Sequence, residues 1–128
     1  MEYAAVGNYT RAHLDMRVAG ASPVELVLLL TDGLLEELSR LRGHILHQRL
    51  KEKEKAVDKC LRIIHGLSAS LDLEQEGSLA HEMDKLYMHC AWKLNDASIK
   101  LSIEPLEEVI KLTSDIREGW QNAFDESQ

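Results

Sequence analysis

Apolar residues recur along most of the chain at intervals of three and four positions, which is the spacing of one face of an α-helix. The pattern is interrupted only where glycine, proline or groups of acidic and polar residues occur. No stretch shows the alternation that is typical of a strand. The pattern therefore predicts four long helices, over residues 22–48, 51–71, 78–101 and 104–123.

The first of these helices has a specific start signal. In the stretch Ser22-Pro-Val-Glu25, the serine is suited to cap the helix and proline to occupy its first position. The glutamate is placed to reach back to the amide of the capping residue. This capping box predicts a helix that begins directly after Ser22.

The number and length of the helices indicate the fold class. Four helices of similar length joined by short connections favour antiparallel neighbours. Residues 2–18 have a weaker apolar pattern, and we expect a short helix or arm there that docks on the rest. The prediction is an all-α fold: an antiparallel up-down four-helix bundle with a short N-terminal helix or arm packed on it, in one domain over residues 1–128.

Three helices carry apolar residues beyond the single stripe that a bundle requires, which is about three positions in seven. The surplus is clearest in the first helix, where Leu26 to Leu30 are all apolar. Either the surplus residues contact additional neighbours inside the bundle, or they form a groove that binds an apolar segment of a partner. The surplus positions are Val27, Leu28 and Leu35 in the first helix, Ile63 in the second, and Met88, Trp92 and Ile99 in the third.

Composition and charge narrow the classes of function. The 128 residues are 45% hydrophobic but only 5% aromatic, as expected of a helical domain, and the net charge is -7. An acidic chain of this kind does not favour nucleic acid as a partner. No basic start followed by an apolar stretch predicts a secretion signal, and no apolar run approaches the ~20 residues of a membrane span. We therefore expect a cytosolic protein without stable membrane insertion.

The sequence contains few signals of chemistry. Cys60 and Cys90 lie in apolar helical stretches and are expected to be free, buried thiols. His44 and His47 share a helix face, but the sequence places no third ligand beside them, so we predict no metal site and no cofactor. No nucleophile motif or glycine-rich phosphate loop occurs. The prediction is that the chain is not an enzyme.

One histidine suggests an alternative function. His81 is followed four residues later by Lys85, an arrangement that resembles the phosphorylated histidine of a phosphotransfer bundle. In that family a small residue follows the lysine, and here Leu86 stands in its place. A histidine phosphotransfer-type four-helix bundle that acts through His81 is therefore retained as the alternative.

Several stretches together resemble one known family. ASPVELVLLLTDGLLEEL, which begins at Ala21, resembles the signature of the flagellin-specific export chaperones, the FliS family: Ala-Ser-Pro-x-Glu-Leu, an apolar run, then Tyr-Asp-Gly. Asn8-Tyr9 resembles the tyrosine upstream of that signature. LDLEQEGSLAHEMDKLY resembles the family's glycine turn followed by Leu-Tyr, and LEEVIKLTSDIREGW resembles its C-terminal helix. The four elements occur in the family's order over about residues 8–120.

The resemblance implies a cytosolic four-helix bundle without cofactor or catalysis. It implies that the chain binds the C-terminal segment of newly made flagellin, prevents its premature polymerisation, and delivers it to components of the flagellar type III export apparatus. In the family the N-terminal arm lies near the partner groove, so Tyr9 joins the seven surplus residues as an expected partner-binding residue.

Two positions depart from the family pattern. Thr31 stands where the family has tyrosine before Asp-Gly, and Ser98 stands where asparagine is common. A threonine has no ring to place in a partner's pocket. The identity of the client is therefore left open, and a co-chaperone role with another flagellar protein is a second alternative.

Overall fold

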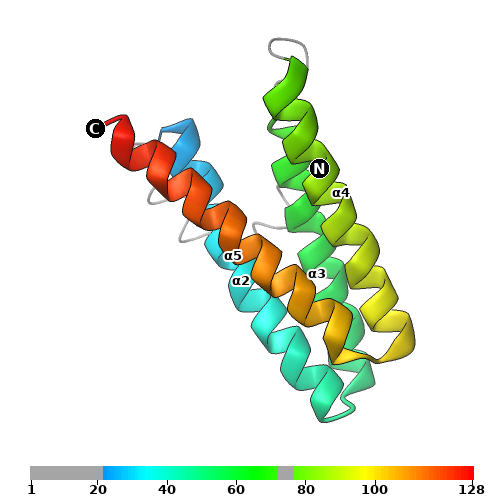
Figure 1. Ribbon diagram of the computed structural model, residues 1–128. Helices are drawn as coiled ribbons and strands as arrows, with labels where there is room; N and C mark the ends of the chain where they lie inside the picture. The colour runs from blue at the N-terminus through cyan, green and yellow to red at the C-terminus, as the bar shows by residue number, and fades with distance from the viewer. Residues whose placement is uncertain (1–21, 72–76) are drawn as a thin grey trace.

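The computed structural model describes residues 22–71 and 77–128 and shows helices packed against helices (Figure 1). Each helix contacts the next along the chain, and α5 returns to contact α2, which makes a ring of four neighbours. The predicted all-α bundle is confirmed, whereas the arm expected over 2–18 lies outside the described residues. The helices are α2 (Pro23–Leu46), α3 (Leu50–Ala69), α4 (Gly77–Lys100) and α5 (Ile103–Glu126).

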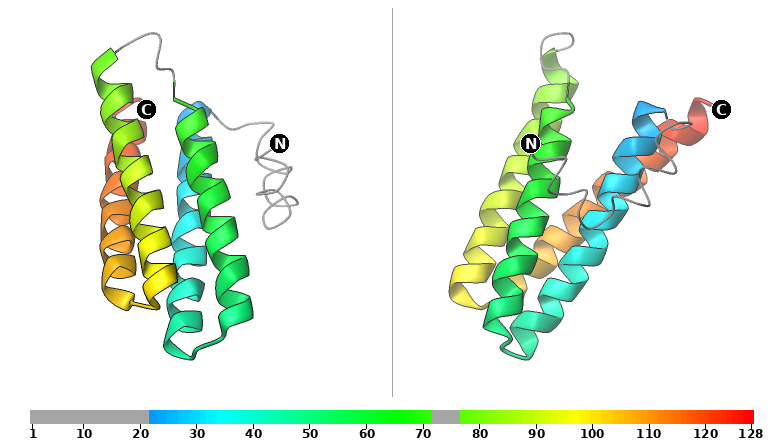
Figure 2. Two further views of the ribbon diagram at one scale, coloured as in Figure 1. Left: turned by 90° about the vertical axis from the view of Figure 1, so that its right-hand side faces the viewer. Right: turned by 180° about the vertical axis from the view of Figure 1, so that it is seen from behind.

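The bundle is closed at one end and open at the other. The connections from α2 to α3 and from α4 to α5 lie at the closed end (Figure 1). Towards the opposite end, the pair formed by α2 and α5 diverges from the pair formed by α3 and α4, as Figure 2 shows from behind. The N-terminal half of α4 and the C-terminal half of α5 therefore lie apart from each other at the open end.

The start of α2 shows the capping box that the sequence predicts. The Glu25 amide donates to Ser22 Oγ at 3.1 Å, and the Ser22 amide donates to Glu25 Oε1 at 2.8 Å. Proline occupies the first turn, where its missing amide hydrogen costs nothing. The helix therefore begins where local chemistry satisfies its free backbone donors.

The core is built from aliphatic side chains of all four helices. Leu38, Ile64, Leu94 and Leu106 are fully buried, one from each helix. Cys60 and Cys90 are also buried and form no disulfide. Burial raises the pKa of both thiols, because the thiolate would lose its hydration, and that of Cys90 rises to about 11.

Two ion pairs join α2 to α5 outside the core. Asp32 Oδ1 accepts from Arg117 Nε at 2.7 Å, and Glu107 Oε2 lies 3.0 Å from Arg42 Nη2. The bond to Asp32 raises the pKa of the Arg117 guanidinium. All four side chains are partly exposed, so each pair contributes little stability.

Two helices end on a residue other than glycine in the left-handed conformation. Gln48, after α2, has φ 57°, and Leu101, after α4, has φ 51°. In each case the next amide closes the helix end, with the Arg49 amide 2.8 Å from the His44 carbonyl and the Ser102 amide 3.1 Å from the Ala97 carbonyl. Helix ends of this type favour glycine because other side chains are strained there.

Replacing Gln48 by glycine is expected to stabilise the protein. The exposed glutamine makes the left-handed conformation costly, and relief of that strain exceeds the added backbone entropy of glycine in the unfolded chain. We expect the free energy of unfolding, measured by urea denaturation, to rise by about 0.5–1 kcal/mol. Gln48→Ala keeps the strain and serves as the control, and equal stabilities of the two variants would contradict the prediction.

Candidate partner-binding surfaces

Part of the predicted surplus forms an exposed apolar surface on α4. Met88 is 38% exposed, Trp92 63% and Ile99 82%. These three residues, the Trp92 row, project from the helix instead of packing into the core. Lys93 holds its ammonium 5.9 Å from the centre of the Trp92 ring, and its Nζ lies 2.9 Å from Glu108 Oε1 on α5. The indole therefore has a polar neighbour and an open apolar face.

The other predicted partner-binding residues lie elsewhere. Leu28 is 8% exposed and Ile63 is 2% exposed, so both are buried, and Ile63 belongs to the main core cluster. Val27 and Leu35 are half-buried on α2. Tyr9 lies outside the described residues. The structure therefore brings Met88, Trp92 and Ile99 together on one helix face and does not join the remaining positions to it.

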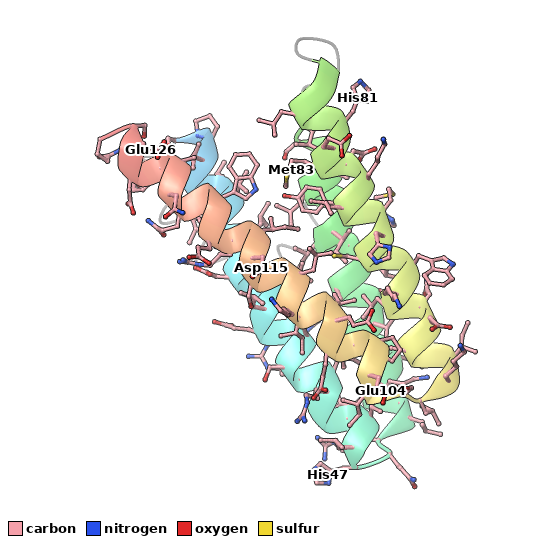
Figure 3. All side chains as sticks on the ribbon, viewed as in Figure 1. His47, His81, Met83, Glu104, Asp115 and Glu126 are labelled. Atoms are coloured by element: carbon pink, nitrogen blue, oxygen red, sulfur yellow. The ribbon has the colours of Figure 1, made fainter. Side chains whose placement is uncertain are left out.

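A second apolar surface lies at the open end of the bundle. It is a cleft of about 400 Å3 between α4 and α5, called here the α4–α5 cleft. In Figure 3 the Met83 side chain points from α4 towards α5. The α4 wall is formed by Leu79, Met83 and Leu86, and the α5 wall by Leu112, Asp115, Ile116, Gly119, Trp120 and Ala123.

One hydrogen bond crosses between the two helices beside this cleft. Trp120 Nε1 donates to the Tyr87 hydroxyl oxygen at 3.4 Å. Burial raises the pKa of Tyr87, and the bond from Trp120 opposes that shift by favouring the phenolate. The indole and the phenol therefore link α4 to α5 near the point where the two helices separate.

The apolar pattern along the chain does not indicate this cleft. Leu79, Met83, Leu86 and Trp120 all recur at three- and four-residue spacing with other apolar residues, and an apolar stripe of this kind is expected to face the interior of a bundle. That expectation is wrong for Leu79, which is 70% exposed, because α5 does not approach the first turns of α4 closely enough to cover it. The one local signal is Gly119, where the apolar face of α5 has no side chain.

The two apolar surfaces lie on opposite sides of α4. Met83, on the cleft wall, and Trp92, at the centre of the exposed row, are nine residues apart. Nine steps of about 100° bring the second side chain about 180° from the first. A ligand in the cleft is thus separated from the Trp92 row by the width of the helix.

The Thr-Asp-Gly stretch in α2 has a structural role. Thr31 is buried, and its hydroxyl donates to the Val27 carbonyl at 2.7 Å. Asp32 forms the ion pair with Arg117, and Gly33 is buried. The side chain at the position where this chain departs from the expected tyrosine therefore lies inside the bundle.

The described residues offer little support for chemistry. His81 is exposed and points away from the bundle in Figure 3, but the nearby Lys85 Nζ lies 3.6 Å from Glu82 Oε2. That lysine is thus placed beside a carboxylate. In the two described ranges, no three His, Cys, Asp or Glu side chains gather in a way that could hold a metal ion. Nor is any helix there long and apolar enough to cross a bilayer.

Comparisons with known proteins agree on one family. Residues 5–127 match the family described as Flagellar protein FliS. The chain is 33% identical over 116 residues to the flagellar secretion chaperone FliSB of Pseudomonas aeruginosa, covering 91% of this chain and 92% of that protein. It is 32% identical over 114 residues to the flagellar secretion chaperone FliS of Salmonella typhimurium, covering 88% and 84%. These matches give no support to a phosphotransfer protein or to a co-chaperone.

Proposed function

We propose, because the chain belongs to the FliS family of flagellar proteins, that it is a flagellar secretion chaperone that binds the C-terminal segment of flagellin. By holding that segment it prevents premature polymerisation and delivers the flagellin to the flagellar type III export apparatus. It works in the cytosol as a binding protein, without cofactor or catalysis. The observation that carries this proposal is the family match over nearly the whole chain.

The energetics of binding require an extended apolar surface. A flagellin tail that is disordered alone must be ordered when it binds, at a cost of about 1–2 kcal/mol per residue. At ~25 cal/mol per Å2, ten ordered residues need roughly 400–800 Å2 of apolar burial to offset that cost. One aromatic side chain buries about 150–250 Å2, so a single residue is insufficient. Several exposed apolar residues spread along the helices suit such a client.

Of the predicted partner-binding residues, those of the Trp92 row meet the need for exposed apolar surface without any movement of the bundle. Its three side chains extend over three turns of α4 and are exposed. Tyr9, Val27 and Leu35 extend the proposed contact surface to the arm and to α2. Leu28 and Ile63, also in the predicted set, are buried and become accessible only if neighbouring segments move aside during binding.

Co-purification tests the proposed function directly. We expect full-length flagellin, co-expressed with this protein, to be recovered in a stoichiometric complex. Flagellin lacking its C-terminal segment should not be recovered, because the segment that orders on the chaperone is absent. The control is the isolated segment fused to an unrelated carrier, which should restore recovery. Equal recovery of intact and truncated flagellin would disprove the proposal.

A further inference from the structure

We propose that Glu108 on α5 positions the Trp92 ring on α4 by holding Lys93 against it, so that the indole meets the client in one preferred orientation. This inference rests on the proposed function in taking the Trp92 row as the client surface. It goes further in giving α5 a part in that surface, and in naming two charged residues that raise its affinity for the client.

The Lys93 ammonium lies between the indole and a carboxylate. Its Nζ is 5.9 Å from the centre of the Trp92 ring and 2.9 Å from Glu108 Oε1. Neighbouring residues in a helix project about 100° apart, so their side chains do not ordinarily meet. The contact between ring and ammonium therefore needs the lysine side chain to be held towards the ring, and Glu108 is the carboxylate that holds its charged end.

Lys93 is bound differently from the other lysines described on α4. Lys85 and Lys100 pair with carboxylates of their own helix, Glu82 at 3.6 Å and Asp96 at 3.1 Å, and their side chains are 75% and 66% exposed. The Lys93 side chain is only 24% exposed and pairs with a residue of another helix. Its stem therefore packs on the protein surface, which restricts the positions that its ammonium can take.

A positioned ammonium restricts the indole as well. A mostly exposed tryptophan can turn between rotamers, and a cation over its ring favours one of them. At exposed sites the strength of such a contact corresponds to about a two- to fivefold preference. A ring that already has its bound orientation loses less conformational entropy on binding, so the same factor should appear in the affinity for the client.

Three substitutions separate positioning from a general loss of charge. Glu108→Gln removes the carboxylate charge and keeps nearly the same shape, and Lys93→Met keeps an unbranched stem without the ammonium. Glu107→Gln is the matched control, because Glu107 is also exposed on α5 and its Oε2 lies 3.0 Å from Arg42 Nη2 on α2. None of the three substituted residues belongs to the core, so all three variants should fold.

The environment of the ring is measured in the full-length protein without flagellin. The chain contains two tryptophans, Trp92 and Trp120, whose indole N–H groups are observed separately in a nitrogen-correlated NMR spectrum. We expect Glu108→Gln and Lys93→Met to shift the Trp92 signal in the same direction and to leave the Trp120 signal in place. Glu107→Gln should move neither signal.

Calorimetric titration with the isolated C-terminal segment of flagellin measures the consequence for binding. Glu108→Gln and Lys93→Met should each weaken binding by about two- to fivefold, and Glu107→Gln should bind as the wild type does. The variant that carries both Glu108→Gln and Lys93→Met should bind no more weakly than Lys93→Met alone, because the carboxylate acts only through the ammonium.

An unchanged Trp92 signal in the Glu108→Gln protein would overturn the inference, and so would wild-type affinity in both test variants. Tighter binding by Glu108→Gln would show that the carboxylate holds the ammonium away from the ring. Additive losses in the double variant would show that Glu108 contacts the client itself. If the wild-type protein did not bind the segment, the proposed function would fail, whereas the NMR result would still decide whether Glu108 positions the ring.

Discussion

Replacing Trp92 by alanine is expected to weaken binding of the flagellin C-terminal segment by about 30-fold or more, with little change in the stability of the bundle. Truncation of a central aromatic contact commonly costs 2 kcal/mol or more, which corresponds to roughly 30-fold in affinity. Trp92 is mostly exposed in the free protein, so its removal leaves no cavity in the core. Calorimetric titration with the isolated segment measures the first effect and thermal unfolding measures the second.

Two further variants serve as a comparison and a control for Trp92→Ala. Met88→Ala, in the same row, should weaken binding in the same direction but less, since a smaller area is lost. Asn122→Ala changes an exposed polar residue on α5 and should leave both affinity and melting temperature unchanged. If Trp92→Ala lowered the melting temperature as far as a core truncation does, the side chain would have to be a core residue, and the proposed surface would be wrong.

Local patterns were sufficient to predict the helices and their shared interior. The capping box at Ser22 and Glu25 forms because its chemistry depends only on neighbouring residues. Leu38 and Leu94 are buried because helical spacing places them on the same face as the other apolar residues of their helices. The last helix extends to Glu126, beyond the expected end at residue 123, because no glycine or proline stops it there.

Helical spacing could not predict which of the surplus apolar residues are buried and which are exposed. Ile63 and Trp92 were both identified as extra apolar positions, yet the first is buried and the second is exposed. Helical periodicity shows which side of a helix a residue occupies. It does not show how many other helices lie on that side. Among the described helices, α4 packs mainly against α3 and α5, and the row with Trp92 lies on its exposed face.

The α4–α5 cleft depends on how the two helix pairs are arranged over the whole length of the bundle. Leu86 and Trp120 have the spacing of core residues, and at the closed end of the bundle the same spacing does produce a core. The cleft exists because two helix pairs diverge towards the open end (Figure 2). That divergence is a feature of the whole bundle, and apart from Gly119 the residues around Leu86 and Trp120 do not indicate it.

Replacing Leu94 by alanine is expected to lower the free energy of unfolding by about 2–5 kcal/mol, measured by urea denaturation. Leu94 is fully buried on α4, two residues after Trp92 and on the other side of the helix. The loss combines the transfer free energy of the removed methyl groups with the cost of the cavity that they leave. For a domain stabilised by about 5–15 kcal/mol, this is a large fraction of the total.

Leu94→Ala and Trp92→Ala should therefore have opposite consequences. Under conditions where the Leu94→Ala protein remains folded, its affinity for the flagellin segment should match that of the wild type, because the exposed row is intact. A loss of affinity that exceeds its unfolded fraction would show that the core and the client surface are coupled. If neither stability nor affinity changed, Leu94 would not be packed as the structure describes, and the assignment of the two faces of α4 would fail.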